Sequence, residues 1–189
     1  MIYFVRVNGD TLHNNSHKPN SYVPHEPPHW PKTRFNYLDF CLKRGVVRIG
    51  WPDTGDLTKP GTGALAAAYR LGKLELYVQN YLRTFRAIPV GSLIMTPDSE
   101  TPGAFHMGEV TKPYYYFHNV PEDPYECAHR LGVQWDNDGD GKFRVYQASD
   151  LGINTRGGFW RRAFADLAST EGARGFVPLL QSAREKVTS

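Results

Sequence analysis

Residues 90–117, VGSLIMTPDSETPGAFHMGEVTKPYYYF, decide the fold of this chain. The apolar run Leu93–Met95 begins after a Gly-Ser pair, and a polar turn over 97–103 separates it from the second run, Phe105–Val110. Two short apolar runs joined by a turn rich in Pro, Ser, Thr and Gly predict a β-hairpin. The aromatic run Tyr114–Phe117 predicts another strand. The stretch therefore predicts a sheet with mostly antiparallel neighbours.

The remaining sequence adds strands and amphipathic helices around this hairpin. Apolar residues repeat at helical spacing in several segments, and β-branched runs bounded by Gly, Pro or Asn indicate strands in others. Strands are predicted over Ile2–Val7, Val46–Trp51, His129–Trp135 and Lys142–Tyr146, the last two as a hairpin, and helices from an N-cap at Thr33 to a stop at Gly45 and over Thr62–Leu71, Lys73–Arg86, Phe159–Leu167 and Phe176–Val187. The sequence therefore predicts an α+β fold, with a curved sheet of about six strands and helices at its margins.

Length and composition predict a single domain. The chain has 189 residues, of which 40% are hydrophobic and 22% are charged, as in globular proteins. Residues 11–31 are rich in Pro, His and Asn and predict a long mobile surface loop. Residues 157–189 predict a helical C-terminal extension of the domain 1–189.

Composition also bears on the compartment and the partners. No segment is apolar enough to span a membrane, and the N-terminus lacks the pattern of a secretory signal, so we expect a cytoplasmic protein without a membrane partner. Cys41 and Cys127 are too few for a disulfide framework and are expected to be free structural thiols. The net charge of +3 permits a phosphate-backbone partner, and the 13% aromatic content suits base stacking.

Four motifs, in this order, carry a resemblance to a known family. They are MIYFVRV at 1–7, GVVRIGWPDTGDL at 45–57, YLRTFRAIPVGSLIMTPDS at 81–99 and FHMGEVTKPYYY at 105–116. Together they resemble the PUA-like superfamily, especially its EVE and YTH branches and the related N-terminal reader domains of modified-DNA restriction systems. The resemblance extends over roughly Met1 to Tyr146, although the 11–31 loop has no clear counterpart in it.

The resemblance implies a PUA-like pseudobarrel with an aromatic-lined pocket for a base, with or without a modification. By position, Trp51 is the pocket residue, and Thr96, Pro97 and Asp98 lie at the mouth of the pocket. Trp30 is a candidate for a second aromatic wall because of its side chain alone. An extruded base regains about 1–3 kcal/mol by stacking on an aromatic side chain.

The resulting hypothesis is a module that binds DNA or RNA. An aspartate or a backbone carbonyl at the rim would read the Watson–Crick edge of the base, and arginines would contact the phosphates. The candidates for phosphate contacts are Arg48, Arg83, Arg86, Arg161 and Arg162.

The stretch 136–143, DNDGDGKF, matches the first eight positions of a calcium-binding EF-hand loop. Asp136, Asp138 and Asp140 stand at oxygen-ligand positions. Position twelve is Gln147 in place of the bidentate Glu, and the flanks predict strands. We therefore favour a tight acidic turn and expect no cofactor, with weak Ca²⁺ binding at 136–147 as the alternative.

Catalytic motifs are sparse. His13 with His17 and His25 with His29 have a spacing known from zinc ligands, but no helix is expected to align them. Cys127 and His129 lack an orienting third group, so no catalytic residue is assigned and a binding function is favoured over an enzymatic one. Two alternatives stay open: a small metal-dependent hydrolase or nuclease, and a protein-interaction subunit of a defence or regulatory complex.

Overall fold

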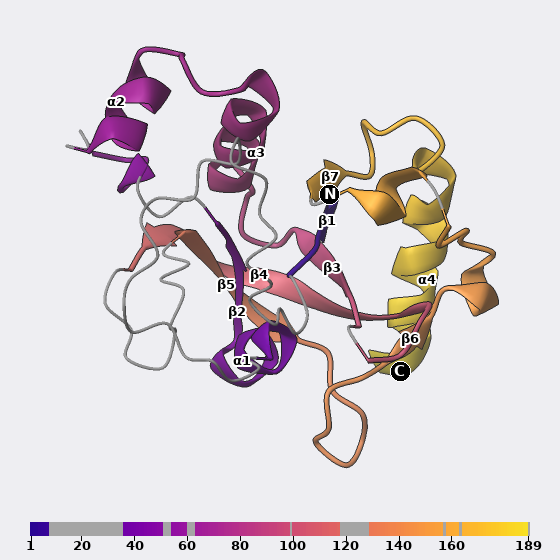
Figure 1. The fold of residues 1–189 in the computed structure, drawn as a ribbon. Helices are drawn as coiled ribbons and strands as arrows, with labels where there is room; N and C mark the ends of the chain where they lie inside the picture. The colour runs from indigo at the N-terminus through magenta and orange to yellow at the C-terminus, as the bar shows by residue number, and fades with distance from the viewer. Residues whose placement is uncertain are drawn as a thin grey trace.

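The computed structural model describes residues 1–7, 36–50, 54–59, 63–98, 100–117, 129–156, 158–162 and 164–188. Within these ranges, one mixed, open sheet of seven strands is combined with a few helices (Figure 1). The predicted α+β class is confirmed, with one strand more than expected. The predicted loop at 11–31 lies outside the described residues.

The described helices and strands do not form an internal repeat. None of the described helices is long and apolar enough to cross a membrane. The order is β1 (Ile2–Val5), α1 (Tyr37–Arg44), β2 (Val46–Ile49), α2 (Ala64–Arg70), α3 (Leu76–Arg86), β3 (Leu93–Pro97), β4 (Ala104–Tyr116), β5 (His129–Trp135), β6 (Tyr146–Gln147), η2 (Ser149–Leu151), η3 (Gly158–Arg161), β7 (Phe164–Asp166), η4 (Arg174–Phe176) and α4 (Val177–Thr188).

The strands lie in the order β2-β5-β4-β3-β1-β7, and β6 pairs with the start of β4. Every neighbouring pair is antiparallel except β1 with β3, which is parallel with Ile2 opposite Leu93. In a flat sheet, the four steps from β2 to β1 would separate these strands by about 19 Å. Their Cα atoms nevertheless approach within 8 Å, so the sheet is strongly curled.

Both faces of the sheet are buried, because successive side chains of a strand point to opposite faces. Tyr3 and Val5 enter a core beneath α1 and α3, which we call the α1-side core. Ile2 and Phe4 enter a second core beneath η3 and α4, which we call the α4-side core. α1 and α3 therefore cover one face of the sheet and α4 covers the other.

The length of α1 is set by the residues at the two ends of this helix. The side chain of Asn36 accepts a hydrogen bond from the Asp39 N–H at 2.8 Å and caps the N-terminus. Gly45 ends the helix with φ of 61°, a left-handed conformation that favours glycine. The predicted N-cap, Thr33, lies outside the described residues, and the helix starts three residues later than that prediction requires. Trp135 fixes α1 to β5 by donating from Nε1 to the Cys41 carbonyl at 3.0 Å.

Two strand predictions need correction. Phe105–Val110 and Tyr114–Phe117 are not separate strands: both runs, except Phe117, belong to the 13-residue β4, whose pairing with β5 shifts register around Lys112. These irregularities accommodate Pro113 within the strand. Lys142–Tyr146 does not form a ladder with β5; a single bridge joins Asn137 to Phe143, and β6 pairs with β4 instead.

The C-terminal extension is not purely helical. Phe159–Leu167 contains only a short 3₁₀ turn before β7, which joins the sheet beside β1. The final helix is confirmed as α4. The extension therefore completes the sheet and covers one of its faces, as Figure 1 shows for α4.

Two adjacent leucines of α4 provide a test of how this helix packs on the α4-side core. Leu180 is fully buried in the α4-side core, whereas Leu179 is 45% exposed. We expect Leu180→Ala to lower the free energy of unfolding by about 2–5 kcal/mol, because it leaves a cavity. Leu179→Ala is the matched control and should change it by less than about 0.5 kcal/mol. Urea unfolding measures both, and equal effects would contradict the placement of α4.

Candidate functional site

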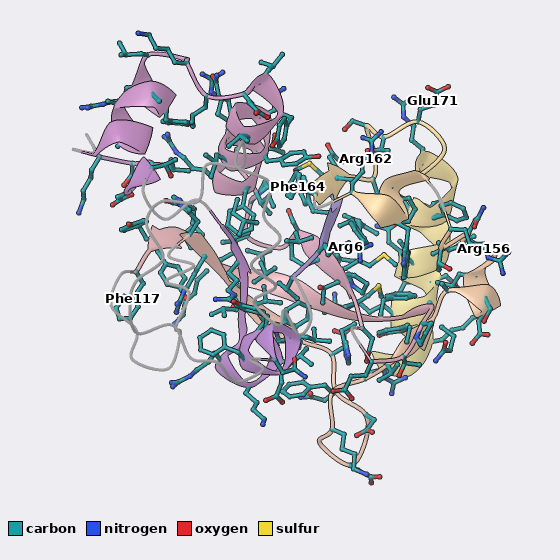
Figure 2. The ribbon with its side chains drawn as sticks, in the orientation of Figure 1. Arg6, Phe117, Arg156, Arg162, Phe164 and Glu171 are labelled. Carbon is teal, nitrogen blue, oxygen red and sulfur yellow. The ribbon has the colours of Figure 1, made fainter. Side chains whose placement is uncertain are left out.

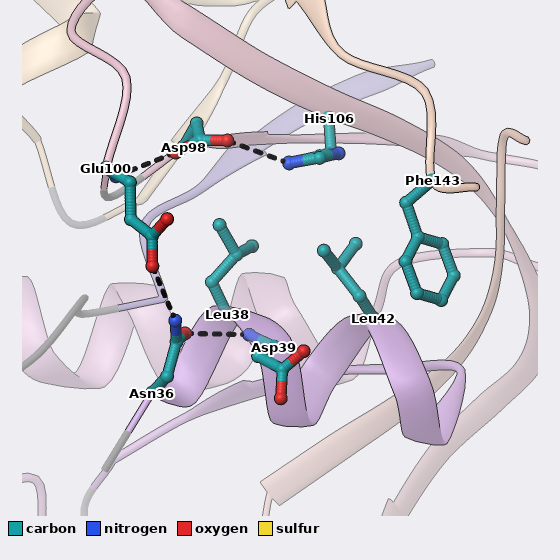
Figure 3. Close-up of a pocket in the computed structure, with 8 residues that line it drawn as sticks. All are labelled: Asn36, Leu38, Asp39, Leu42, Asp98, Glu100, His106 and Phe143. Carbon is teal, nitrogen blue, oxygen red and sulfur yellow. Dashed lines mark hydrogen bonds and ion pairs between the residues drawn. The ribbon is translucent and has the colours of Figure 1, made fainter. Parts of the chain in front are cut away.

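A cavity of about 260 Å³ lies between α1 and the hairpin of β3 and β4 (Figure 3). It is smaller than the roughly 300–1,000 Å³ typical of pockets for drug-sized ligands, so it suits a small group. Its lining combines apolar and acidic side chains: Asn36, Leu38, Asp39, Leu42, Asp98, Glu100, His106 and Phe143.

The apolar walls come from α1 and from the acidic turn. Leu38 and Leu42 lie one helical turn apart on the same face of α1, and both point into the cavity in Figure 3. The half-buried ring of Phe143 closes one side, and the bridge to Asn137 holds its backbone. An aromatic ring beside two leucines offers a planar apolar ligand a surface for stacking and contact.

Asp98 supplies an ionised carboxylate at the polar side of the cavity. Its Oδ1 accepts hydrogen bonds from the backbone N–H groups of Glu100 at 2.7 Å and Thr101 at 3.0 Å. Burial alone would raise the pKa of Asp98, but these two N–H groups and the His106 ring outweigh burial and lower the pKa below its ordinary value. The group is therefore charged at neutral pH.

His106 lies directly beside this carboxylate. Its Nε2 is 3.2 Å from Asp98 Oδ2, and its Nδ1 is 2.8 Å from the carbonyl oxygen of Arg144. Both neighbours are hydrogen-bond acceptors, so both ring nitrogens are directed at oxygens of the protein.

Thr96 stands opposite His106 in the register of β3 and β4. Directly paired residues share a face of the sheet, so the Thr96 side chain lies beside the ring of His106. Thr96 is completely buried, and its Oγ1 has no hydrogen-bond partner in the described part of the chain. A buried hydroxyl without a partner is costly, and this one lies in β3 beside the cavity without lining it.

The structure brings only part of the predicted pocket together. Asp98 lines the cavity, whereas Thr96 and Pro97 are buried in β3 just before it. Trp30 and Trp51 lie outside the described residues, so their predicted roles stay predictions.

Several lining residues were not predicted from the sequence: Asn36, Glu100, His106 and Phe143. The predicted hairpin contains the signal for His106, because an antiparallel register places it close to Asp98 across the turn. No local pattern indicates Phe143, since only the return of the acidic turn over the sheet brings it to α1.

The predicted phosphate contacts occupy different environments. Arg48 lies in β2 and is only 3% exposed, with its guanidinium 4.0 Å from the centre of the Tyr37 ring. Its predicted role as a surface phosphate contact is therefore corrected, because the strand directs it into the packed interior. Arg83, Arg86 and Arg162 are exposed, and the side chain of Arg161 lies outside the described part of the chain.

Arg162 lies next to α3, although the two are distant in sequence. It lines a second hollow, of about 460 Å³, together with Asn80 and Thr84 of α3 and with residues of β7. Figure 2 shows Arg162 close to Phe164 at the edge of the sheet. The fold therefore brings Arg162 to the same helix that carries Arg83.

Carboxylates of the acidic turn accept hydrogen bonds from other groups of the protein. Arg184 Nε donates to both carboxylate oxygens of Asp136, at 3.0 and 3.1 Å, and Tyr146 donates to Oδ2 at 2.9 Å. Asp138 Oδ1 accepts from the N–H groups of Asp140 and Lys142, as expected of a tight turn.

Among the described residues, no group of three or more His, Cys, Asp or Glu side chains is arranged to hold a metal ion. The paired histidines of the 11–31 loop and Cys127 lie outside those residues. Cys41 is buried in α1.

The contacts of Asp98 predict an acid-dependent contribution to stability. Its pKa is lower in the folded protein, so the ionised form stabilises the fold above the ordinary value of 3.8, and this contribution is lost as the pH falls through the lower folded value. We expect Asp98→Asn to lower the free energy of unfolding by about 1–3 kcal/mol at pH 7 and to reduce its decline in acid. Urea unfolding over a pH series measures this.

The exposed Asp140 provides the control, and Asp140→Asn should retain the parent's stability at pH 7. If the parent and Asp98→Asn lost stability in parallel throughout the acid range, the assigned role of Asp98 would be wrong.

The comparisons with known proteins supply a family but no activity. No curated protein matches the chain. The model of a domain of unknown function, DUF8426, matches residues 32–154, about two thirds of the chain. The matched segment contains α1, β3, β4 and the acidic turn, and so each of the described residues that line the cavity. The chain therefore belongs to the family of domains of unknown function DUF8426.

Proposed function

We propose that this protein binds DNA or RNA and holds one base, with or without a modification, in the cavity between α1 and the hairpin of β3 and β4. The observation that carries the proposal is the combination of apolar walls with carboxylate acceptors around a small cavity. A nucleobase needs both: its faces are apolar and planar, and its edge carries hydrogen-bonding groups.

The charge of the lining supports a base over a phosphate as the group that enters. Among the described lining side chains, Asp39, Asp98 and Glu100 are acidic and none is a lysine or arginine. Carboxylates repel a phosphate but accept hydrogen bonds from a base. The phosphates of the same strand would remain outside.

The curl of the sheet supports a PUA-like pseudobarrel as the finer description of the fold. β1 and β2 are four steps apart in the strand order and still come within 8 Å, as in a sheet that curls toward closure. The motifs at 1–7, 45–57, 81–99 and 105–116 resemble the EVE and YTH branches of that superfamily. In this proposal, Trp51 and Trp30 complete the base pocket.

The exposed arginines near α3 are the proposed contacts for the phosphate backbone. α3 packs on the α1-side core, so α1 and α3 cover the same face of the sheet. Arg83 and Arg86 extend from α3, and Arg162 approaches the same helix. A strand whose base enters the cavity would follow this face.

Removal of the aromatic wall tests the pocket. We expect Phe143→Ala to weaken binding of a fluorescein-labelled single strand by about 1–3 kcal/mol, because stacking is lost. Fluorescence anisotropy with short DNA and RNA strands, with and without methylated bases, measures this. Tyr77→Ala is the matched control, since Tyr77 is an aromatic residue of α3 that is 53% exposed and does not line the cavity. Equal affinities of the parent and Phe143→Ala would place the base elsewhere.

The phosphate contacts are tested by the dependence of affinity on salt. Replacing Arg83 and Arg162 by Gln should reduce the slope of log affinity against log salt by about 0.7 for each lost contact with a single strand. Arg174→Gln is the control, because Arg174 is exposed in η4 beside the α4-side core, on the other face of the sheet. A slope that falls equally in all variants would indicate a general charge effect.

A further inference from the structure

We propose that the cavity selects bases that carry an exocyclic amino group (adenine, cytosine and guanine) and discriminates against uracil and thymine. The inference rests on the proposed function and deepens it by naming the class of base. It follows from the balance of hydrogen-bond acceptors and donors that face the cavity.

Acceptor capacity remains on the two carboxylates nearest the hairpin turn. Both N–H contacts of Asp98 fall on Oδ1, whereas Oδ2 contacts Nε2 of His106 and no other described group. Glu100 accepts from Asn36 Nδ2 through Oε1 at 3.3 Å, and its Oε2 has no contact among the described residues. Each carboxylate oxygen has two lone pairs, so these groups can accept further hydrogen bonds from a ligand.

Donor capacity is almost used up. His106 directs one nitrogen at Asp98 and the other at the Arg144 carbonyl, so neither is left for a ligand. The Asn36 amide nitrogen is directed at Glu100, as Figure 3 shows. The part of the lining that the structure describes contains no lysine or arginine. The described lining therefore offers acceptors and few donors.

An acceptor-rich lining distinguishes the bases by their edges. Adenine, cytosine and guanine each present an amino group, at N6, N4 and N2, whereas thymine presents the acceptor O4. In uracil and thymine, two carbonyl oxygens flank the N3–H group, and at least one of them would face a carboxylate without a hydrogen between them. A buried acceptor that loses its partner in this way weakens binding.

The position of Glu100 makes it the selecting residue. Its side chain is exposed at the rim and joins the hairpin turn to Asn36 at the N-terminus of α1. A glutamine at this position keeps the shape of the side chain but adds an amide N–H, which can donate a hydrogen bond to a carbonyl oxygen of the base. Glu100→Gln should therefore improve the fit of a keto base without opening the cavity.

The experiment measures the affinity of the full chain for short single-stranded homopolymers of deoxycytidine, deoxyadenosine and deoxythymidine by fluorescence anisotropy. We expect the deoxythymidine strand to bind about tenfold more weakly than the other two. Glu100→Gln should reduce this difference to about twofold. Glu171→Gln, which removes an exposed carboxylate of a distant loop labelled in Figure 2, should leave it unchanged.

The outcomes separate the inference from the proposed function. Equal affinity for the three strands, together with weaker binding by Phe143→Ala, would overturn the selection of amino-bearing bases and leave the base pocket in place. A preference that survives in Glu100→Gln but vanishes in Glu171→Gln would also overturn it. If the protein bound none of the strands, the proposed function would fail, and the inference with it.

Discussion

The parallel pairing of β1 with β3 is the constraint on which the rest of the structure depends. It inserts the N-terminal strand between the hairpin and β7, with Ile2 opposite Leu93 on one side and Phe4 opposite Ala165 on the other. With β1 in this position, alternate residues enter the α1-side and the α4-side cores. The sheet that this pairing completes is curled, since β1 also approaches β2.

The cavity lies where α1 meets the hairpin of β3 and β4. α1 packs on the α1-side core, fixed by the hydrogen bond from Trp135 to the Cys41 carbonyl, and leaves open the space next to the hairpin turn. Backbone N–H groups of that turn hold the Asp98 carboxylate ionised beside the cavity. A rigid turn and a capped helix therefore position the polar and the apolar sides of one small site, which favours a ligand with a flat apolar body and a polar edge.

Much of the fold could be predicted from the sequence, because local patterns determine it. The spacing of Val78, Leu82 and Phe85 predicts α3, and the apolar runs on either side of a polar turn predict the hairpin of β3 and β4. β7 could not be predicted: Phe159–Leu167 has the spacing of a helix, but the free edge of β1 recruits Phe164–Asp166 as a strand. Tertiary pairing outweighs local preference there.

The site was less predictable than the fold. Asp98 follows from the resemblance and lies at the cavity, whereas Arg48 was assigned to the surface although its strand directs it against Tyr37. Phe143 reaches the cavity only because the turn after β5 folds back toward α1. Long-range returns of this kind leave no periodic signal in the sequence.

The antiparallel contact between β7 and β1 also determines the order in which the sheet can be completed during synthesis. The ribosome delivers β1 first, yet one edge of β1 waits for β3 and the other for Phe164–Asp166, near the end of the described chain. Contacts between such distant segments carry a high entropic cost of closure and slow folding. Until β7 emerges, the nascent chain exposes an unpaired strand edge, which is the kind of surface that chaperones protect.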